Sequence, residues 1–393
     1  MKVKLINQAE NLLARVIELN IQGFSIKTPK KALWSYGSRY CEAAILSAPS
    51  YRGIIEIYLR LNSDQLNKLL DDEKKRNSFK YRLVSALKKV RENEIVVLIP
   101  EYEATESHFK KSMEYMADLL LHPRVNILAV PIIRNMTLDN VIENIRTFVN
   151  SASSAFDILT VPTILPIPLL KLEVLIREYE VFFSKYNSFR LDYVCLDFNS
   201  SNPISKYDIV RFTLRKFKQI ENEIRTPVVI HGVNVKYGRA VHKEKIAPAR
   251  DLTSPYMGID ILGSNHKPLK LPREYMVKKE FKVLNIKEYG YYDLNQIIPG
   301  NLSYYEPKNS LITINTLHKL EKAGNHLTLE AMIKNYNAEK QELELQNILT
   351  QLQKNENLEE RLNSKSSLDE KSKKIVKKHM RKFYEQNISF EKQ

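Results

Sequence analysis

Cysteine is scarce in this chain, since Cys41 and Cys195 are the only two among 393 residues. Both lie inside apolar runs and are far apart in the sequence. This scarcity excludes a disulfide-rich scaffold and a cysteine-rich zinc site, and it fits free thiols in a reducing compartment. We therefore expect a cytoplasmic protein with two buried, reduced cysteines.

Long apolar segments are also missing. No stretch approaches the roughly twenty apolar residues that span a bilayer, and the first residues do not form a secretory leader. Glycine is limited to 10 residues, and the chain contains no Gly-rich phosphate loop, no His-Glu-x-x-His pair and no nucleophile elbow. We expect no membrane partner, no bound metal and no cofactor.

Positively charged residues outnumber negatively charged ones. Lys and Arg number 61 against 46 Asp and Glu, which gives a formal net charge of +15. Such an excess favours an anionic partner, most commonly a nucleic acid, although a basic surface can also serve solubility alone.

Short apolar runs alternate with longer amphipathic stretches between residues 93 and 266. This rhythm is typical of strands and helices that build a parallel sheet, because a strand covered on both faces is apolar throughout. With about eight such runs the chain can close a (β/α)8, TIM-like barrel of the α/β class. The expected strands are Ala43–Ser47, Ile54–Leu61, Glu94–Pro100, Val125–Pro131, Phe156–Pro162, Leu191–Asp197, Pro227–Gly232 and Tyr256–Gly263.

The remaining segments complete the predicted organisation. Residues 1–267 form the barrel, 268–362 a barrel-associated segment with a long helix, and 363–393 a basic helical tail. Apolar residues at helical spacing predict a helix at the N-terminus and several on the outer ring. Strand or turn segments are expected at Glu280–Ile286 and Ser310–Ile314. The predicted helices are Gln8–Leu19, two within Ser63–Arg91, Ser107–Leu121, Leu138–Val149, Leu169–Tyr186 and Tyr207–Ile224.

Polar residues at the predicted strand ends are the candidate site, because a barrel gathers its chemistry at the carboxyl ends of its strands. His231, Gly232 and Asn234 offer donors, acceptors and a close backbone approach to a planar base, although His-Gly also suits a tight turn. Asp197 and Asp260 are the candidate catalytic carboxylates. Asp197 also fits a turn before Pro203, and Asp260 also fits a bond to a backbone turn.

Glu101 extends the candidate base-binding set. It follows Pro100 at the end of a predicted strand, together with Glu103. A solvated surface position is the alternative interpretation for both carboxylates.

The C-terminal tail concentrates positive charge beside an apolar face formed by Ile375, Val376, Met380 and Phe383. A basic amphipathic segment of this kind favours docking to a nucleic acid, while a protein partner and simple solvation are the alternatives. A homodimer through the C-terminal helices is a further alternative. The candidate nucleic-acid-binding residues are Lys373, Lys374, Lys377, Lys378, Arg381 and Lys382.

Four segments of the last third occur in the order of conserved motifs in one enzyme family. They are Ile230–Asn234, Gly258–Gly263, Leu284–Asp293 and Leu311–His318. In this order they resemble the tRNA-guanine transglycosylases, the base-exchanging enzymes of queuosine and archaeosine synthesis. The resemblance covers about ninety residues and implies a barrel that binds tRNA, accepts a flipped base and uses an Asp nucleophile at ribose C1′.

The chain departs from that family at three places. Gly263 stands where the family has its nucleophilic Asp, nothing near Pro100–Ala104 matches the base-binding corner, and the three-Cys zinc insertion is reduced to Pro299–Ser303. Glycine cannot form a covalent intermediate, so either Asp260 replaces it or catalysis is lost. We expect guanine exchange into tRNA to be absent or slow.

The leading prediction is a transglycosylase-like nucleic-acid-binding barrel, active in base exchange or glycosidic cleavage, or a catalytically degenerate relative. One alternative is a non-enzymatic nucleic-acid-binding scaffold or subunit. The other is a barrel hydrolase or aldolase that acts on a small metabolite.

Overall fold

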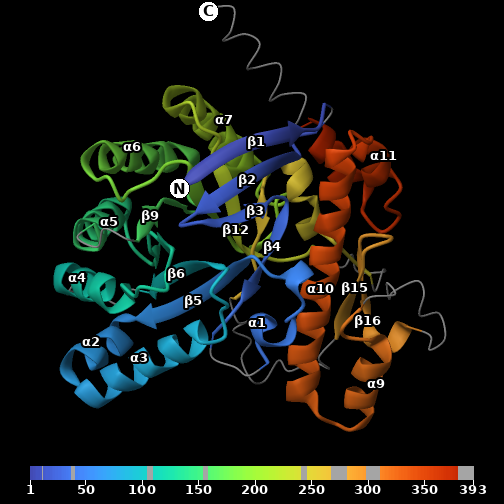
Figure 1. Cartoon of the computed structure of the whole chain (residues 1–393), viewed down its shortest axis with the longest axis horizontal. Coiled ribbons are helices and arrows are strands. Elements are labelled where there is room, and N and C mark those ends of the chain that lie inside the picture. The colour runs from blue at the N-terminus through green and yellow to red at the C-terminus, as the bar shows by residue number, and fades with distance from the viewer. Residues whose placement is uncertain are drawn as a thin grey trace, which may run out of the picture.

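The protein forms a TIM-like α/β barrel, as the sequence predicts (Figure 1). The computed structural model describes residues 1–10, 12–36, 40–103, 109–153, 158–239, 246–266, 281–297 and 310–378. The barrel strands are all paired in parallel, and the last, β14, returns to the first, β4. In chain order they are β4 (Lys30–Trp34), β5 (Ile54–Asn62), β6 (Ile95–Glu103), β7 (Ile127–Ala129), β8 (Ile132–Arg134), β9 (Leu159–Val161), β10 (Thr163–Ile164), β11 (Tyr193–Ser201), β12 (Val229–Val235) and β14 (Ile261–Leu262).

The ring is nearly closed, and two of its positions are made of broken strands. Strands β7 and β8 both pair with β6, and β9 and β10 are separated only by Pro162, which has no amide hydrogen to donate. Strand β7 pairs with β9, while β10 pairs with β11. Buried Val, Ile and Leu side chains predominate in these strands, as expected where both faces are covered.

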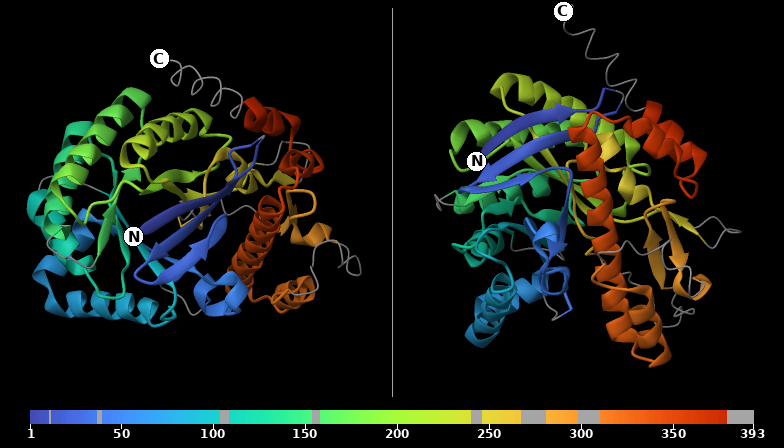
Figure 2. Two further views of the ribbon diagram at one scale, coloured as in Figure 1. Left: turned by 45° about the horizontal axis from the view of Figure 1, so that its top comes forward. Right: turned by 45° about the vertical axis from the view of Figure 1, so that its right-hand side comes forward.

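Amphipathic helices surround the barrel and cover its outer face (Figures 1 and 2). Helix α5, for example, buries Val141, Ile145 and Phe148 against the sheet. Helix α2 begins at a capping box formed by Asn62 and Gln65, which fixes the turn after β5. The ring consists of α2 (Ser63–Asp71), α3 (Glu73–Leu87), α4 (Phe109–Leu120), α5 (Leu138–Ala152), α6 (Leu169–Lys185) and α7 (Tyr207–Ile224).

The predicted N-terminal helix at Gln8–Leu19 is wrong. The structure has an antiparallel sheet there, formed by β1 (Lys2–Gln8), β2 (Arg15–Ile21) and β3 (Phe24–Lys27). Strand β2 alternates buried Ile17, Leu19 and Ile21 with more exposed residues, and this period of two competes with the helical spacing of the same apolar residues.

One further predicted strand is helical, and the strand or turn predicted at Ser310–Ile314 is a bend that leads into a helix. Residues 43–45 belong to the short helix α1 (Glu42–Ile45), so the first barrel strand is β4. Ile314 begins α9 (Ile314–Lys322), which Thr313 caps by accepting a hydrogen bond from the Thr316 amide. The predicted strand at Glu280–Ile286 is present as β15 (Lys282–Asn285).

A C-terminal unit packs on the first barrel strand through the long helix α10 (His326–Gln353), which Figure 1 shows running beside the barrel. Glu342 of α10 accepts hydrogen bonds from Lys30 Nζ at 2.5 Å and the Lys31 amide at 2.8 Å. Asn7 donates to the Leu352 carbonyl at 2.6 Å and joins α10 to β1. The remaining elements here are η1 (Pro49–Tyr51), β13 (Ala247–Pro248), η2 (Arg250–Thr253), η3 (Pro255–Met257), β16 (Gly290–Asp293), η5 (Leu294–Gln296), α11 (Leu358–Asn363) and helical residues 370–378.

Within the described part of the chain, no helix combines the length and apolar character needed to cross a bilayer.

Candidate active site inside the barrel

Glu56 on β5 lies at the centre of a polar cluster inside the barrel. Its Oε1 is 2.8 Å from His231 Nε2 of β12, and its Oε2 is 2.9 Å from His266 Nε2. The Ser264 amide donates to Oε2 at 2.9 Å. Burial on its own would raise the pKa of Glu56, but the hydrogen bonds from the two histidines outweigh it and hold that pKa well below its usual range.

Both histidines are held in place by aromatic neighbours. His231 Nδ1 is 2.8 Å from the Tyr193 hydroxyl, and the ring of His266 stacks on Tyr58 with centroids 4.7 Å apart. Because each ring has a fixed partner, the cluster is preorganised around the Glu56 carboxylate.

Gly263 leaves room for that carboxylate. A Cβ at position 263 would lie 2.2 Å from Glu56 Oε1 and 2.5 Å from the Gly232 carbonyl oxygen. No larger side chain fits without displacing Glu56. Glycine therefore suits this position, because a carboxylate from another strand occupies the space that a Cβ would take.

Asp197 of β11 forms a second cluster with Asn234, as the sequence predicts for neighbouring strands. Asn234 Nδ2 donates to Asp197 Oδ1 at 2.9 Å, and the Asn199 amide donates to the same oxygen at 3.0 Å. Arg134, the last residue of β8, donates to Asp197 Oδ2 at 2.5 Å. These donors fix the orientation of the Asp197 carboxylate. Tyr58 joins this cluster to Glu56, since its hydroxyl lies 3.3 Å from Asn234 Nδ2 and its ring stacks on His266.

Glu101 lies beside Asp197 and is not a surface residue. It is 1% exposed, and its Oε1 is 3.6 Å from Arg134 Nε and 3.5 Å from Arg60 Nε. Arg60 also donates to Glu103 at 2.7 Å. The exposed fraction of the side chain rises from none at Glu56 to about a quarter at Arg60 and Glu103. The polar residues therefore extend from the barrel interior toward its carboxyl end.

Asp260 does not face this mouth, and the expectation that it does is wrong. It directly precedes β14, and its carbonyl oxygen accepts from the amide of Lys30, the first residue of β4. Its carboxylate accepts two hydrogen bonds from Arg15, both at 2.9 Å, and one from the Ile230 amide. Asp260 therefore belongs to an ion-pair cluster with Arg15 and Glu221 at the amino end of the barrel, where structural residues gather.

The structure thus brings together Asp197, Asn234, His231 and Glu101 and separates Asp260 from them. Gly232 packs among them without a polar role, and its Cβ position is only 3.1 Å from the Phe198 ring. Glu56, His266, Tyr58 and Arg134 belong to the same cluster and were not predicted. The charged residue Glu56 inside an apolar strand was the available signal, since a carboxylate buried there requires partners.

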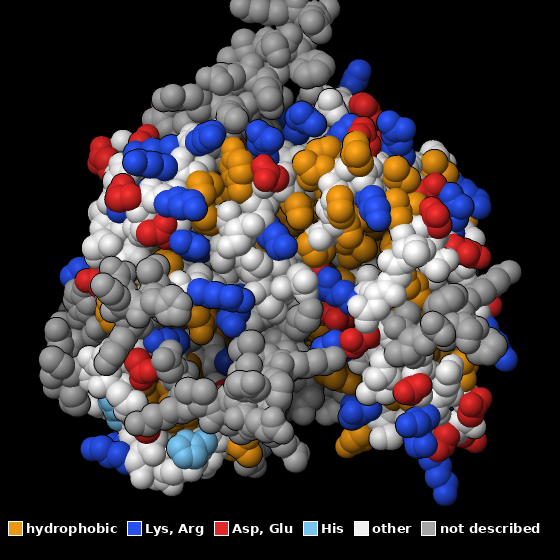
Figure 3. All heavy atoms as spheres, turned by 180° about the vertical axis from the view of Figure 1, so that it is seen from behind, with side chains coloured by type: hydrophobic (Ala, Val, Ile, Leu, Met, Phe, Trp, Pro, Cys, Tyr) orange, Lys and Arg blue, Asp and Glu red, His pale blue; other side chains and the backbone are white. Residues whose placement is uncertain are grey.

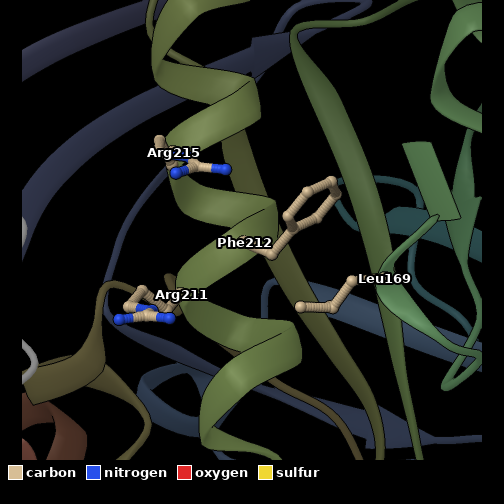
Figure 4. Close-up of a pocket in the computed structure, with 4 residues that line it drawn as sticks. All are labelled: Leu169, Arg211, Phe212 and Arg215. Atoms are coloured by element: carbon tan, nitrogen blue, oxygen red, sulfur yellow. The ribbon is translucent and has the colours of Figure 1, made fainter.

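A small cavity on the outer ring is flanked by arginines. It measures about 60 Å³ and is lined by Leu169 at the start of α6 and by Arg211, Phe212 and Arg215 of α7. Figure 4 shows the two arginines one turn apart on the same side of α7, with Phe212 directed toward Leu169. Helices α6 and α7 begin just after the carboxyl ends of β10 and β11, so this cavity lies on the mouth side of the barrel.

The predicted tail residues divide into two groups. Lys373 is buried and donates to the Asn363 carbonyl, and Lys377 Nζ is 2.9 Å from Glu359, so both have structural partners. Lys374 and Lys378 are exposed, while Arg381 and Lys382 lie outside the described residues. Lys and Arg side chains also gather on the upper part of the face seen in Figure 3.

No group of three or more His, Cys, Asp or Glu side chains among the described residues is arranged to hold a metal ion. Neither the models of known protein families nor the curated protein sequences match this chain.

Proposed function

We propose that the protein is a transglycosylase-like barrel that binds nucleic acid, tRNA in particular, and cleaves or exchanges a base at the N-glycosidic bond. The observation that carries the proposal is the convergence of Asp197, Glu101 and Arg134 with the Glu56 cluster in the carboxyl half of the barrel. A non-enzymatic scaffold has no need for buried carboxylates gathered at this end, because each is costly to desolvate.

In this proposal Asp197 is the nucleophile in place of Asp260. One oxygen of its carboxylate forms a bond to ribose C1′ while the C1′–N bond breaks, and the departing base keeps the electron pair and takes up a proton. Water or an incoming base then attacks C1′, gives up a proton and releases the carboxylate. Asn234 and Arg134 orient Asp197, and Glu101 lies where it can accept hydrogen bonds from a flipped base.

The nucleic-acid part of the proposal is supported by charge. The chain carries a net +15, and the Arg211 and Arg215 guanidinium groups flank a small cavity beside the mouth. Arginine pairs of this kind suit phosphate oxygens, and the affinity they supply depends on salt. The exposed Lys374 and Lys378 would add to this electrostatic attraction for a nucleic acid.

Base release and base exchange test the function directly. Purified protein is incubated with total tRNA, and separately with DNA, and free bases are measured by mass spectrometry with and without labelled guanine and adenine. We expect Asp197→Asn to lower the rate at least a hundredfold, because an amide cannot act as the nucleophile. The matched control is Asn199→Ala, which leaves the carboxylate and its Asn234 and Arg134 partners in place.

Undiminished base release by a folded Asp197→Asn variant would remove Asp197 from the reaction. Absence of any base release from tRNA or DNA by the wild-type protein would contradict the enzymatic proposal altogether.

A further inference from the structure

His266 keeps one ring nitrogen open at the carboxyl end of the barrel. Its Nε2 lies 2.9 Å from Glu56 Oε2, and within the described part of the chain nothing bonds to its Nδ1. The ring stacks on Tyr58 with centroids 4.7 Å apart, and Trp34 packs against it at an angle of 57°. An imidazole with one nitrogen bonded and the other open can give or take a proton at the open position.

His231, the other histidine beside Glu56, has no such open position. Its Nδ1 lies 2.8 Å from the Tyr193 hydroxyl, and its Nε2 lies 2.8 Å from Glu56 Oε1. Its side chain has no exposed surface, whereas that of His266 is 4% exposed. Of the two histidines, His266 is therefore the one that can reach a ligand in the barrel mouth.

The charged groups nearest to Asp197 are engaged with each other. Arg134 donates to Asp197 at 2.5 Å and lies 3.6 Å from Glu101, and Arg60 lies 3.5 Å from Glu101. A guanidinium group does not release its proton in a protein, and a carboxylate that faces one favours its acceptor form. These groups hold charge in place and leave proton transfer to a neighbour.

Asn234 places His266 beside the proposed nucleophile. Its Nδ2 donates to Asp197 Oδ1 at 2.9 Å, and its Oδ1 accepts from the His266 amide at 3.3 Å. One buried side chain thus joins the backbone of His266 to the carboxylate of Asp197. A nucleophile with a proton donor close by is what cleavage of an N-glycosidic bond requires.

We propose that His266 is the acid–base residue of the reaction at Asp197, a role that rests on the function proposed above. The imidazolium gives its Nδ1 proton to the nitrogen of the departing base while the C1′–N bond breaks and an Asp197 oxygen bonds to C1′. The neutral ring then takes a proton from the attacking water or incoming base, and the bond between Asp197 and C1′ breaks. One turnover therefore restores both the proton and the carboxylate.

Glu56 keeps the ring in the orientation that this role needs. Its carboxylate lies against Nε2, so the proton of the neutral ring stays on Nε2 and Nδ1 remains the acceptor. The two histidines outweigh the effect of burial and hold the pKa of Glu56 well below its usual range. The charged carboxylate then stabilises the imidazolium form of His266.

A leaving group that needs no proton separates the two roles. Guanine methylated at N7 is already positively charged in tRNA and departs as a neutral base. We expect His266→Gln to slow release of unmodified bases at least a hundredfold and release of 7-methylguanine less than tenfold, because only the former needs an acid. Asp197→Asn should slow both alike. The control is Asn265→Ala at the exposed neighbouring position, which should change neither rate.

Nitrogen NMR of the full chain tests the geometry without any substrate. In the neutral ring of His266 we expect the proton on Nε2 and none on Nδ1, which the nitrogen shifts distinguish. A proton on Nδ1 instead would overturn the proposal, even if His266→Gln failed to fold.

The kinetic result separates this role from the function on which it rests. Base release by the wild-type protein that a folded His266→Gln variant loses equally for both leaving groups, or does not lose at all, would overturn the role of His266 alone. No base release by the wild-type protein would refute the proposed function, and the role of His266 with it.

Discussion

The buried Glu56 carboxylate restricts which residues can stand next to it. Its side chain has no exposed surface. His266 and the Ser264 amide bond to its Oε2, and His231 Nε2 lies 2.8 Å from its Oε1. The lack of a side chain at Gly263 is part of the same arrangement, because the carboxylate occupies the space that a Cβ would take. The cluster therefore predicts specific consequences of changing either residue.

Gly263→Ala should destabilise the protein by about 3 kcal/mol, because the new methyl group would overlap a buried carboxylate and a backbone oxygen. Gly232→Ala is the matched control, since its nearest neighbour would be a ring carbon at 3.1 Å, and it should cost less. Urea denaturation of the three proteins measures the difference. A Gly263→Ala variant as stable as the wild type would mean that Glu56 does not occupy this position.

The depressed pKa of Glu56 makes stability depend on pH. Because the folded-state pKa lies below the unfolded value of about 4.3, Glu56 contributes stability above that pH and loses it as the pH falls further. We expect the difference in unfolding free energy between wild type and Glu56→Gln to shrink as the pH is lowered from 6 to 3. Denaturation at several pH values measures it, and a constant difference would contradict the assignment.

At the scale of elements, the sequence predicted the regular repeats and failed where local patterns compete. Helices α5, α6 and α7 start at the predicted residues because their apolar stripes are long and end at clear boundaries. Residues 12–19 satisfy both helical and strand spacing, and only pairing with β1 and β3 selects the strand. The first barrel strand was missed because β4 is short and carries two lysines.

The sequence predicted those residues of the candidate site that lie on long strands and misplaced the one that lies beside a short strand. Asp197, His231 and Asn234 lie on long, clearly marked strands, so their convergence at one end of a barrel follows from the fold. Asp260 was misplaced because β14 has only two residues and begins after it. Its partner Arg15 comes from an N-terminal strand 245 positions away, and no local pattern reveals such a pairing.

Arg15 joins the N-terminal sheet to the amino end of the barrel, and its removal should be costly. Arg15→Ala leaves Asp260 buried without its cation and leaves Glu221 with only Lys218, and we expect a loss of about 3–5 kcal/mol in unfolding free energy. Lys75→Ala, which removes an exposed ion pair with Asp72, should change stability by less than about 1 kcal/mol. Thermal or urea denaturation compares the two, and similar small losses would contradict a structural role for Arg15.

At the scale of the whole molecule, positive charge is the property most relevant to a nucleic-acid partner. Arg211→Gln combined with Arg215→Gln should weaken tRNA binding and reduce the slope of log affinity against log salt by roughly 1.5 to 2, because two phosphate contacts are lost. Lys80→Gln combined with Arg82→Gln removes the same charge from α3 and serves as the control. Equal effects of the two pairs would show a general charge effect rather than a site at α7.

We expect the C-terminal tail to contribute less to tRNA binding than the two arginines of α7. Lys374→Gln with Lys378→Gln removes the two described tail lysines that are exposed, and it should flatten the salt dependence of tRNA binding without lowering stability. Point substitution is preferable to deletion of residues 366–393, because Asp369 pairs with Arg250 and Leu368 is buried. An unchanged salt slope would remove these lysines from the interface.

The identity of the nucleophile is the central claim, and covalent trapping tests it most directly. The protein is incubated with labelled tRNA without an incoming base, denatured and digested, and the peptide that carries a ribose adduct is identified by mass spectrometry. We predict an adduct on Asp197 within β11 and none in Asp197→Asn. An adduct on Glu56, Glu101 or Asp260, or base release that proceeds without any adduct, would contradict the account.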